Sequence, residues 1–360
     1  MRQQTTRSTR RLVAALATAV ACAAVPAAAT PAAAERPGDR FDLQAHRGGT
    51  GLYTESTLAA FANALELGVS TLELDTQVTS DGAVVVTHDR QISAEKCRDT
   101  GPAFPGDTDF PYVGDYITDL TLAQVQTVEC GYQPLPQHPD QQAVPGPMIE
   151  LRDLFRLVRH YRAHHVTLNI ETKVEAGAPE ETAPREEFVR AVLAEISQYR
   201  MGRQVAIQSF DWGALELVEQ LNPRLPRVAL TNHDFLEIGR PGASPWLGGL
   251  DADDFDGDLV AMADHLDVDA ISPVHGFPQD GVVADPDYEP YVTREMVRDA
   301  HAAGLEVIPW TVDDPDTMRA LIATGIDGLI TDRPDRLREV MAEEGLRLPR
   351  PLRGPHGPVG

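Results

Sequence analysis

DLQAHRGGTGLYTESTLAAFANALELGVSTLELDTQVTSDGAVVVTHD occupies residues 42–89, and we interpret it as a strand, a glycine loop, a helix, a strand and a hairpin. Three short apolar runs in it each end in ionisable side chains, which are His46 and Arg47, then Glu73 and Asp75, then His88 and Asp89. Apolar runs of this length are typical of strands buried on both faces. Parallel α/β folds carry reactive groups just past the carboxyl ends of their strands, so we expect these side chains at one rim.

Strand-like and helix-like segments alternate along the rest of the chain. The predicted parallel strands span 42–46, 70–75, 166–171, 205–209, 227–230, 268–272, 306–310 and 328–331. Downstream of residue 148, the predicted helices span 149–161, 186–199, 212–221, 294–303, 315–323 and 334–344. Eight strands alternating with helices predict an α/β fold of the closed (β/α)8 TIM barrel type rather than an open sheet. An open doubly wound sheet would begin with a G-x-G-x-x-G loop, which residues 46–51 (HRGGTG) do not match.

Two irregular segments interrupt this alternation. Residues 90–148 are rich in Pro and Gly, and we interpret them as an insertion after the second strand that lies over one side of the rim. We interpret residues 232–262 as a second insertion, and residues 83–88 as an extra hairpin arm or as the continuation of the second strand beyond the rim. We predict that Cys97 and Cys130 form a disulfide that pins the first insertion, rather than two free thiols. Closing this loop would stabilise the fold by about 3–4 kcal/mol.

The first 34 residues have the features of an export signal. Four arginines precede an apolar run over 12–25, and small residues at 32–34 end the segment. We therefore predict a signal peptide at 1–34, cleaved near Ala34, and a secreted or cell-envelope protein. Residues 9–12 (TRRL) suggest the twin-arginine route, with the Sec route left open. Lipid anchoring at Cys22 and an uncleaved anchor are the alternatives to soluble export. The barrel then spans 35–345, and residues 346–360 form a Pro-rich tail that we expect to be loosely held.

The chain is strongly acidic, with a formal net charge of −24. Of its 31 basic residues, four lie in residues 1–34, which leaves 27 against 55 acidic residues in the remainder. This charge opposes binding to nucleic acid and to anionic membranes, and we expect neither a nucleic-acid partner nor stable membrane insertion. A divalent cation in the active site would offset the cost of binding an anionic substrate. The sequence indicates no particular oligomeric state.

Glu73 and Asp75 lie two positions apart on a predicted strand, so both side chains point to the same face. Neighbouring carboxylates repel each other unless a proton or a cation lies between them. Glu171 ends the next predicted strand around the barrel, and three converging carboxylates form an oxygen-rich site of the kind that Ca²⁺ or Mg²⁺ prefers. We therefore predict that Glu73, Asp75 and Glu171 bind one divalent cation, with ion pairing at the rim as the simpler alternative.

His46 and His88 flank these carboxylates in the predicted arrangement. Two imidazoles on either side of a scissile bond suit a general base and a general acid, because their pKa lies near neutral pH. Arg47 can bind a phosphate oxygen bidentately and Lys173 can add a point charge, although both could instead balance nearby carboxylates. A cation, two imidazoles and two basic side chains together indicate hydrolysis of a phosphate ester.

Six motifs extend this pattern along the chain, namely His46-Arg47-Gly48, Glu55-Ser56-Thr57, Glu73-Leu74-Asp75, His88-Asp89, Glu171-Thr172-Lys173 and GIDGLITD at 325–332. In order and spacing they resemble the glycerophosphodiester phosphodiesterase family, over roughly residues 42–342. The resemblance implies a TIM barrel that hydrolyses glycerophosphodiesters, its small-molecule substrates, to glycerol 3-phosphate and an alcohol. The matching histidines would be the acid–base pair, and the matching carboxylates would bind the metal.

The resemblance also implies a route, in which the glycerol 2-hydroxyl attacks phosphorus and water then opens the cyclic phosphate. One histidine would act as base and then acid, and the other the reverse. The chain departs from the family at residues 54–57, which read TEST where the family usually has Pro-Glu-Asn-Thr or Pro-Glu-His-Thr. Glu55 is retained, and we interpret it as a support for the metal side of the site or as a favourable charge in the first turn of a helix.

Two further residues are candidates for substrate binding. Gln208 ends a predicted strand and could hydrogen-bond substrate, with ordinary rim packing as the alternative. Trp310 could stack on the glycerol or the alcohol group, or simply pack at the top of the barrel. An acidic run at 251–258 lacks the alternation and the final Glu of an EF-hand, so we interpret it as a solvated loop.

Two other functions remain open on the sequence alone. A phospholipase-D-like or phosphatidylinositol-specific lipase would use a related barrel with an apolar lip, for which the two insertions supply Phe110, Tyr112, Trp246 and Leu250. The other hypothesis is a non-catalytic module that binds phosphorylated glycerol polymers. The presence of both histidines and all three carboxylates favours an enzyme over such a module.

Overall fold

The computed structural model describes residues 41–354. The predicted signal peptide, with Cys22 and the cleavage position near Ala34, lies outside the described residues, as do the last six residues of the tail. None of the helices in residues 41–354 combines the length and the apolar content that crossing a membrane requires.

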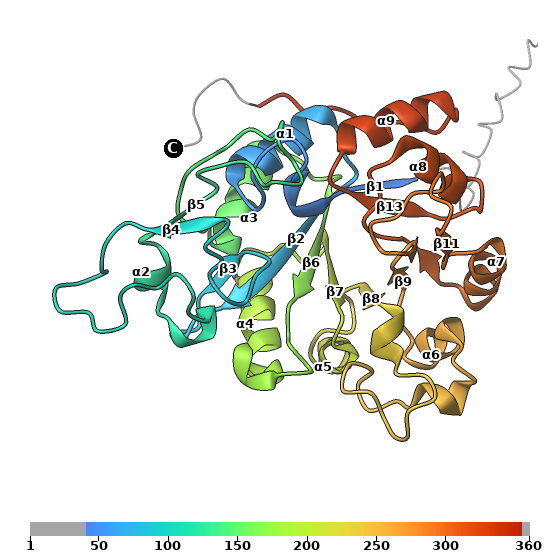
Figure 1. Ribbon diagram of the computed structural model, residues 1–360, viewed down its shortest axis with the longest axis horizontal. Helices are drawn as coiled ribbons and strands as arrows, with labels where there is room; N and C mark the ends of the chain where they lie inside the picture. Colours follow the sequence, from blue (N-terminus) through green and yellow to red (C-terminus); the bar gives the residue numbers. More distant parts are fainter. Residues whose placement is uncertain (1–40, 355–360) are drawn as a thin grey trace, which may run out of the picture. The chain divides into compact units, whose positions relative to one another are not determined.

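Eight parallel strands form a nearly closed barrel, which Figure 1 shows with its helices around it. In chain order they are β1 (Asp42–Ala45), β2 (Thr71–Val78), β6 (Thr167–Thr172), β7 (Val205–Ser209), β8 (Arg227–Thr231), β9 (Ala270–Pro273), β12 (Glu306–Val307) and β13 (Gly328–Thr331). Their order is β12-β9-β8-β7-β6-β2-β1-β13. Two backbone hydrogen bonds of 3.0 Å join the end strands, from Asp327 N–H to the Val307 carbonyl and from Ile330 N–H to the Pro309 carbonyl. The predicted (β/α)8 barrel is confirmed.

The outer helices are α1 (Leu58–Leu67), α3 (Leu151–His160), α4 (Arg185–Gln198), α5 (Trp212–Leu221), α6 (Leu259–His265), α7 (Arg294–Ala303), α8 (Pro315–Ile322) and α9 (Pro334–Glu343). Local sequence sets several of their starts. The Thr57 hydroxyl accepts the Ala60 N–H at the start of α1, and both α8 and α9 begin with a proline, whose missing N–H costs nothing there. Apolar side chains on the inner faces of these helices pack on the strands and form the main core.

The barrel interior contains an apolar cluster and a row of polar side chains. The apolar cluster consists of Ala206, Val228, Ala270, Ile308 and Ile330. In the polar row, Asn169 Nδ2 donates to Gln44 Oε1 at 2.9 Å and to Gln208 Oε1 at 2.7 Å. Gln208 Nε2 then donates to Glu73 Oε1 at 2.7 Å. Buried amides are stable only when paired in this way, so the row fixes the orientation of Glu73 from inside the barrel.

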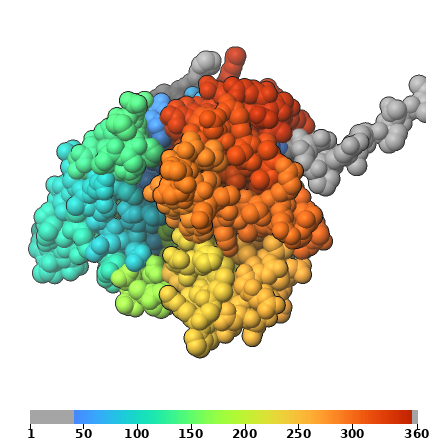
Figure 2. Space-filling view, turned by 45° about the vertical axis from the view of Figure 1, so that its right-hand side comes forward, coloured from blue at the N-terminus to red at the C-terminus, as the bar shows by residue number. Residues whose placement is uncertain are grey.

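The insertion that follows β2 has a small core of its own. Strand β3 (Val84–Val86) pairs antiparallel with β2, which confirms the hairpin arm. Beyond it, β4 (Cys97–Asp99) and β5 (Val128–Cys130) form a two-stranded ribbon in which Cys97 lies opposite Cys130, and the predicted disulfide joins them. Side chains including Ile92, Tyr112, Ile117 and Val128 pack together beneath the ribbon, and the helical turn α2 (Leu122–Val125) adds to them. Figure 2 shows this segment in cyan and green beside the orange and yellow parts of the barrel.

Three local expectations differ from the structure. Helix α6 begins at Leu259, so the irregular part of the second insertion, which contains the short turns η4 (His233–Leu236) and η5 (Ala252–Phe255), ends before residue 262. Two acidic residues of the run at 251–258 act as helix caps, since Asp251 caps η5 and Asp258 caps α6.

Strand β12 ends at Val307 rather than at residue 310, because Pro309 has no N–H to continue the ladder, and Trp310 forms only an isolated bridge with Val274. The tail is not loose over its described part, where Leu352 N–H donates to the Leu65 carbonyl at 2.9 Å. A last small ribbon, β10 (Gly276–Phe277) with β11 (Glu289–Pro290), lies after β9.

Candidate active site

Three buried carboxylates meet at the carboxyl ends of β2 and β6. The parallel register places Asp75 directly beside Glu171, and Glu73 lies two residues earlier on the same face of β2. One oxygen from each of Glu73, Asp75 and Glu171 lies within 4.8 Å of the others. The structure thus brings the three predicted metal ligands together as the sequence pattern required.

Arg47 lies against two of these carboxylates. It sits in the loop after β1 with a left-handed φ of 51°, next to Gly48, where a Cβ would lie 2.9 Å from the Ala60 Cβ. Its backbone N–H donates to Glu73 Oε2 at 2.8 Å. Its guanidinium lies 3.0 Å from Glu55 Oε2 and 3.1 Å from Asp75 Oδ2. The side chain predicted to bind phosphate is therefore also the counter-charge of the carboxylates.

Lys173 approaches the same group from β6. Its Nζ lies 3.2 Å from Glu171 Oε1 and 3.6 Å from Asp75 Oδ1. Lys173 therefore balances the charge of the carboxylates, which was the alternative interpretation. Like Arg47, it also lines the main cavity, from which it can reach a substrate.

Each predicted catalytic imidazole is held by a carboxylate. His46 Nδ1 lies 2.5 Å from Asp332 Oδ1, at the end of β13. His88 Nδ1 lies 2.7 Å from Oδ1 of the adjacent Asp89. These contacts make Nδ1 the donor in both rings and leave both Nε2 atoms for a substrate, which is how carboxylates commonly set the tautomer of a working histidine.

The two imidazoles differ in their preference for a proton. Burial and the charge of Arg47 act to lower the pKa of His46, but the carboxylates of Asp332 and Glu73 outweigh them and raise it above the usual 6.5. Burial lowers the pKa of His88 to about 4, and the charges of Arg47 and Lys173 contribute. His46 therefore favours the protonated ring and His88 the neutral one, a separation typical of an acid and a base in one site.

A cavity of about 1160 Å³ joins these groups. Both histidines, the three carboxylates, Arg47 and Lys173 line it, together with Glu55, the predicted support, and Gln208 and Trp310, the two further candidates for substrate binding. Trp310 donates its indole N–H to the Ser272 carbonyl at 2.8 Å and packs edge-on against Phe210, with ring centroids 5.5 Å apart. Gln208 faces inward to Glu73, so its amide is already engaged as the support of a carboxylate.

Sequence reasoning gave no role to several residues that complete the site. It included Asp89 and Asp332 in motifs but did not connect them to the histidines, although Asp89 directly follows His88 and Asp332 directly follows a strand. Asn169, in the polar row, lies two residues before Glu171 on β6 and so shares its face, which was also a signal. Lys96 and His138 lie in the Pro-rich insertion, where no periodicity points to the barrel rim.

A family comparison agrees with this geometry. Residues 46–336 match the model of the glycerophosphoryl diester phosphodiesterase family. The chain belongs to this family. The match begins at His46 and extends beyond Asp332, so it includes both imidazoles with their carboxylates and all three clustered acids.

Relatives and solved structures agree with the family over most of the chain. The chain is 26% identical to the glycerophosphodiester phosphodiesterase of Caldanaerobacter subterraneus subsp. tengcongensis, over 84% of this chain and 98% of that protein. A crystal structure from Silicibacter pomeroyi, provisionally named a glycerophosphoryl diester phosphodiesterase, is 29% identical with a TM-score of 0.69, covering 86% and 97% of the two chains. An Oleispira antarctica phosphodiesterase, solved with the product sn-glycerol-3-phosphate, shares the fold at 19% identity and a TM-score of 0.60, covering 84% and 96%.

The three acids of this family member fit a divalent cation. Burial raises the pKa of Glu73 to about 7 and that of Glu171 to about 8, and the charge of Asp75 adds to both shifts. Burial acts on Asp75 in the same direction, but Lys173 and Arg47 outweigh it and hold its pKa well below the usual range. Asp75 Oδ2 is fully buried and is ion-paired with Arg47 at 3.1 Å, but it accepts no hydrogen bond of good geometry from the described residues. Carboxylates that hold protons because burial and a neighbouring charge raise their pKa still offer hard oxygen ligands, the donor set that Ca²⁺ or Mg²⁺ takes.

Proposed function

We propose that this chain hydrolyses glycerophosphodiesters to glycerol 3-phosphate and an alcohol, using one divalent cation. Membership of the family and the names of its relatives support the substrate class. The observation that carries the chemistry is that one cavity contains two imidazoles, each held through Nδ1 by a carboxylate, together with the cluster of three acids. Two positioned imidazoles suit general acid–base catalysis at a phosphate ester, and clustered acids suit a cation that offsets its charge.

The opposite directions of the two pKa shifts support one order of proton transfers. His88 Nε2 accepts the proton of the glycerol 2-hydroxyl while that oxygen bonds to phosphorus. His46 Nε2 donates its proton to the oxygen of the departing alcohol as the phosphorus–oxygen bond breaks, which leaves a cyclic phosphate. In the second step His46, now neutral, accepts a proton from water while the water oxygen bonds to phosphorus. The bond between phosphorus and the glycerol 2-oxygen breaks, and His88 returns its proton to that oxygen.

The remaining groups bind and orient the substrate. Glu73, Asp75 and Glu171 would hold the cation, which when bound polarises phosphoryl oxygens and offsets the charge of the diester. Arg47 and Lys173 lie within reach of the same cavity and favour an anionic phosphate there. Trp310 and Phe210 offer ring faces and edges to the apolar side of the glycerol or the alcohol.

Hydrolysis of a substrate panel tests the proposed function. Glycerophosphocholine, glycerophosphoethanolamine and glycerophosphoglycerol are expected to release glycerol 3-phosphate, detected by a coupled enzyme assay. A chelator should abolish the release, and Ca²⁺ or Mg²⁺ added back singly should restore it. Activity that a chelator leaves intact would contradict the metal requirement. Faster turnover of a long-chain lysophospholipid would favour the lipase alternative, and no turnover of any diester would favour a binding module.

The pH dependence of activity at saturating cation tests the two histidines. A base must be neutral and an acid must be protonated, so the rate is expected to fall at low pH when the base gains its proton and at high pH when the acid loses it. Since the pKa of His88 is lowered and that of His46 is raised, His88→Gln should remove the acidic limb and His46→Gln the alkaline limb. Each should lower kcat by about 100- to 10,000-fold. Loss of the alkaline limb in His88→Gln and of the acidic limb in His46→Gln would overturn the assignment of His88 as base and His46 as acid.

We also propose that the chain works outside the cytoplasm. The export features of residues 1–34 and the disulfide between Cys97 and Cys130 support this location, because such a bond persists in oxidising compartments. N-terminal sequencing of protein recovered from the envelope or the medium of the producing cells should give a first residue near 35. An intact residue 1 would contradict the proposal.

A further inference from the structure

The two carboxylates that hold the imidazoles are themselves held, each on its second oxygen. Asp89 uses Oδ1 for His88, and its Oδ2 lies 2.9 Å from the Nζ of Lys96. Asp332 uses Oδ1 for His46, and its Oδ2 lies 3.2 Å from Nε2 of His138. Both outer groups come from the insertion at 90–148, one near each of its ends.

We propose that Lys96 and His138 are positioning residues, through which the insertion sets the orientation of the catalytic base and the catalytic acid together. This proposal rests on the proposed function. A carboxylate held by only one oxygen can rotate about its terminal bond and swing the imidazole with it. A donor on the second oxygen fixes the plane of the carboxylate, and groups of this kind outside a reactive site commonly affect activity by about 10- to 100-fold.

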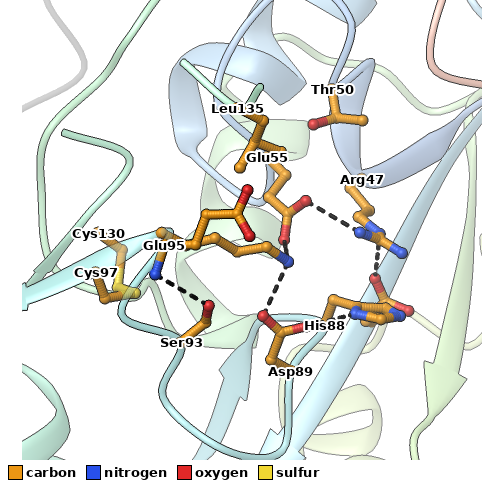
Figure 3. A network of polar contacts seen from close by, with 12 residues as sticks. Arg47, Thr50, Glu55, His88, Asp89, Ser93, Glu95, Cys97, Cys130 and Leu135 are labelled. Carbon is orange, nitrogen blue, oxygen red and sulfur yellow. Dashed lines mark hydrogen bonds and ion pairs between the residues drawn. A yellow bond between two sulfur atoms is a disulfide. The ribbon is translucent and has the colours of Figure 1, made fainter. Parts of the chain in front are cut away.

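Lys96 is fixed firmly enough to act in this way. Its ammonium also lies 2.9 Å from Glu55 Oε1, and the other oxygen of Glu55 meets Arg47. Its backbone carbonyl accepts the Gly131 N–H at 2.9 Å, and the disulfide at Cys97 follows directly in the chain. Figure 3 shows the carboxylates of Glu55 and Asp89 pointing toward each other between the disulfide and His88, which lies next to Asp89. The covalent link therefore holds the base of the lysine side chain while two carboxylates hold its end.

His138 is fixed by a different part of the insertion. Its backbone N–H donates to the Leu135 carbonyl at 2.9 Å, and its carbonyl accepts the Gln141 N–H at 3.0 Å. The buried side chain of Gln141 donates to the carbonyl and the hydroxyl of Thr50, in the loop that carries His46. His138 is thus connected to the loop that carries His46 in two ways, through Asp332 and through Gln141 and Thr50. Displacement of the insertion would therefore move the imidazole of His46 as well.

The charge of these donors also matters. Asp89 and Asp332 both have a pKa below the usual range, although burial acts to raise it in each. At Asp89, the hydrogen bond from His88 and the charge of Lys96 outweigh burial. At Asp332, the charge of His46 and the hydrogen bond from His138 do so. Both carboxylates remain ionised in the working pH range and can keep their imidazoles in the Nδ1–H tautomer.

Substitution of Lys96 tests one arm of the proposal. Lys96→Met, which keeps the length of the side chain but removes the ammonium, is expected to lower kcat on glycerophosphocholine by about 10- to 100-fold and to change KM by less than about twofold. Lys96→Arg should restore most of the loss. In a His88→Gln background, Lys96→Met should cost nothing further, because the imidazole that it orients is gone. Arg98→Met, which removes an exposed ion pair to Glu129 on the same ribbon, is the matched control and should leave kcat unchanged.

Substitution of His138 tests the other arm in the same way. His138→Leu is expected to lower kcat by about tenfold with KM little changed, since the contact is longer, and His138→Gln should restore activity because its amide can still donate to Asp332. In a His46→Gln background, His138→Leu should have no further effect. His160→Leu, on the exposed end of α3, is the control.

Two results would overturn the proposal while leaving the proposed function intact. The first is an additive loss, in which Lys96→Met or His138→Leu lowers kcat as much in the histidine-substituted background as in the original chain. The second is an unchanged kcat in both variants. Full activity in His46→Gln and His88→Gln would instead refute the proposed function. Thermal unfolding identifies any variant that fails to fold, and Lys96→Leu, which also lacks a donor, then replaces Lys96→Met as the neutral substitution.

Discussion

Mutual repulsion among three buried carboxylates is the constraint around which this protein is arranged. Glu73, Asp75 and Glu171 lie within 4.8 Å of one another at the end of two adjacent strands. Three negative charges this close cannot remain ionised in a buried site without positive charge nearby. Arg47 and Lys173 supply part of it, the row of amides inside the barrel holds Glu73, and protons or a cation must supply the rest.

The barrel and the insertion position different groups of the site. The strands of the barrel fix the carboxylates through parallel register, which no single side chain can alter. The imidazoles follow β1 and β3 on short loops, and the insertion reaches over to Asp89 and Asp332. A disulfide in the ribbon and the buried Gln141 tie that insertion down. The proposed metal site thus depends on the barrel, whereas the orientation of the two proposed catalytic imidazoles depends on both parts.

The sequence predicted the strands and most of the site because both follow short-range rules. Ionisable residues directly after apolar runs identified His46 and His88, and a spacing of two placed Glu73 and Asp75 on one face. It could not predict Lys96 or His138, because contacts across a Pro-rich segment depend on how that segment packs and leave no periodic pattern. The prediction of a loosely held tail was wrong over the described residues for a similar reason. Leu352 packs on α1 through tertiary contacts that composition does not reveal.

Calorimetric titration with Ca²⁺ or Mg²⁺ at pH 7, in two buffers of different ionisation enthalpy, tests the central claim most directly. Because the pKa values of Glu73 and Glu171 lie at about 7 and 8, one cation per chain should bind with release of about one to two protons. The paired substitutions Glu73→Gln and Glu171→Gln should abolish this binding, whereas Asp253→Asn and Asp254→Asn on the exposed loop should not. Binding without proton release, or binding that survives the loss of Glu73 and Glu171, would contradict the claim.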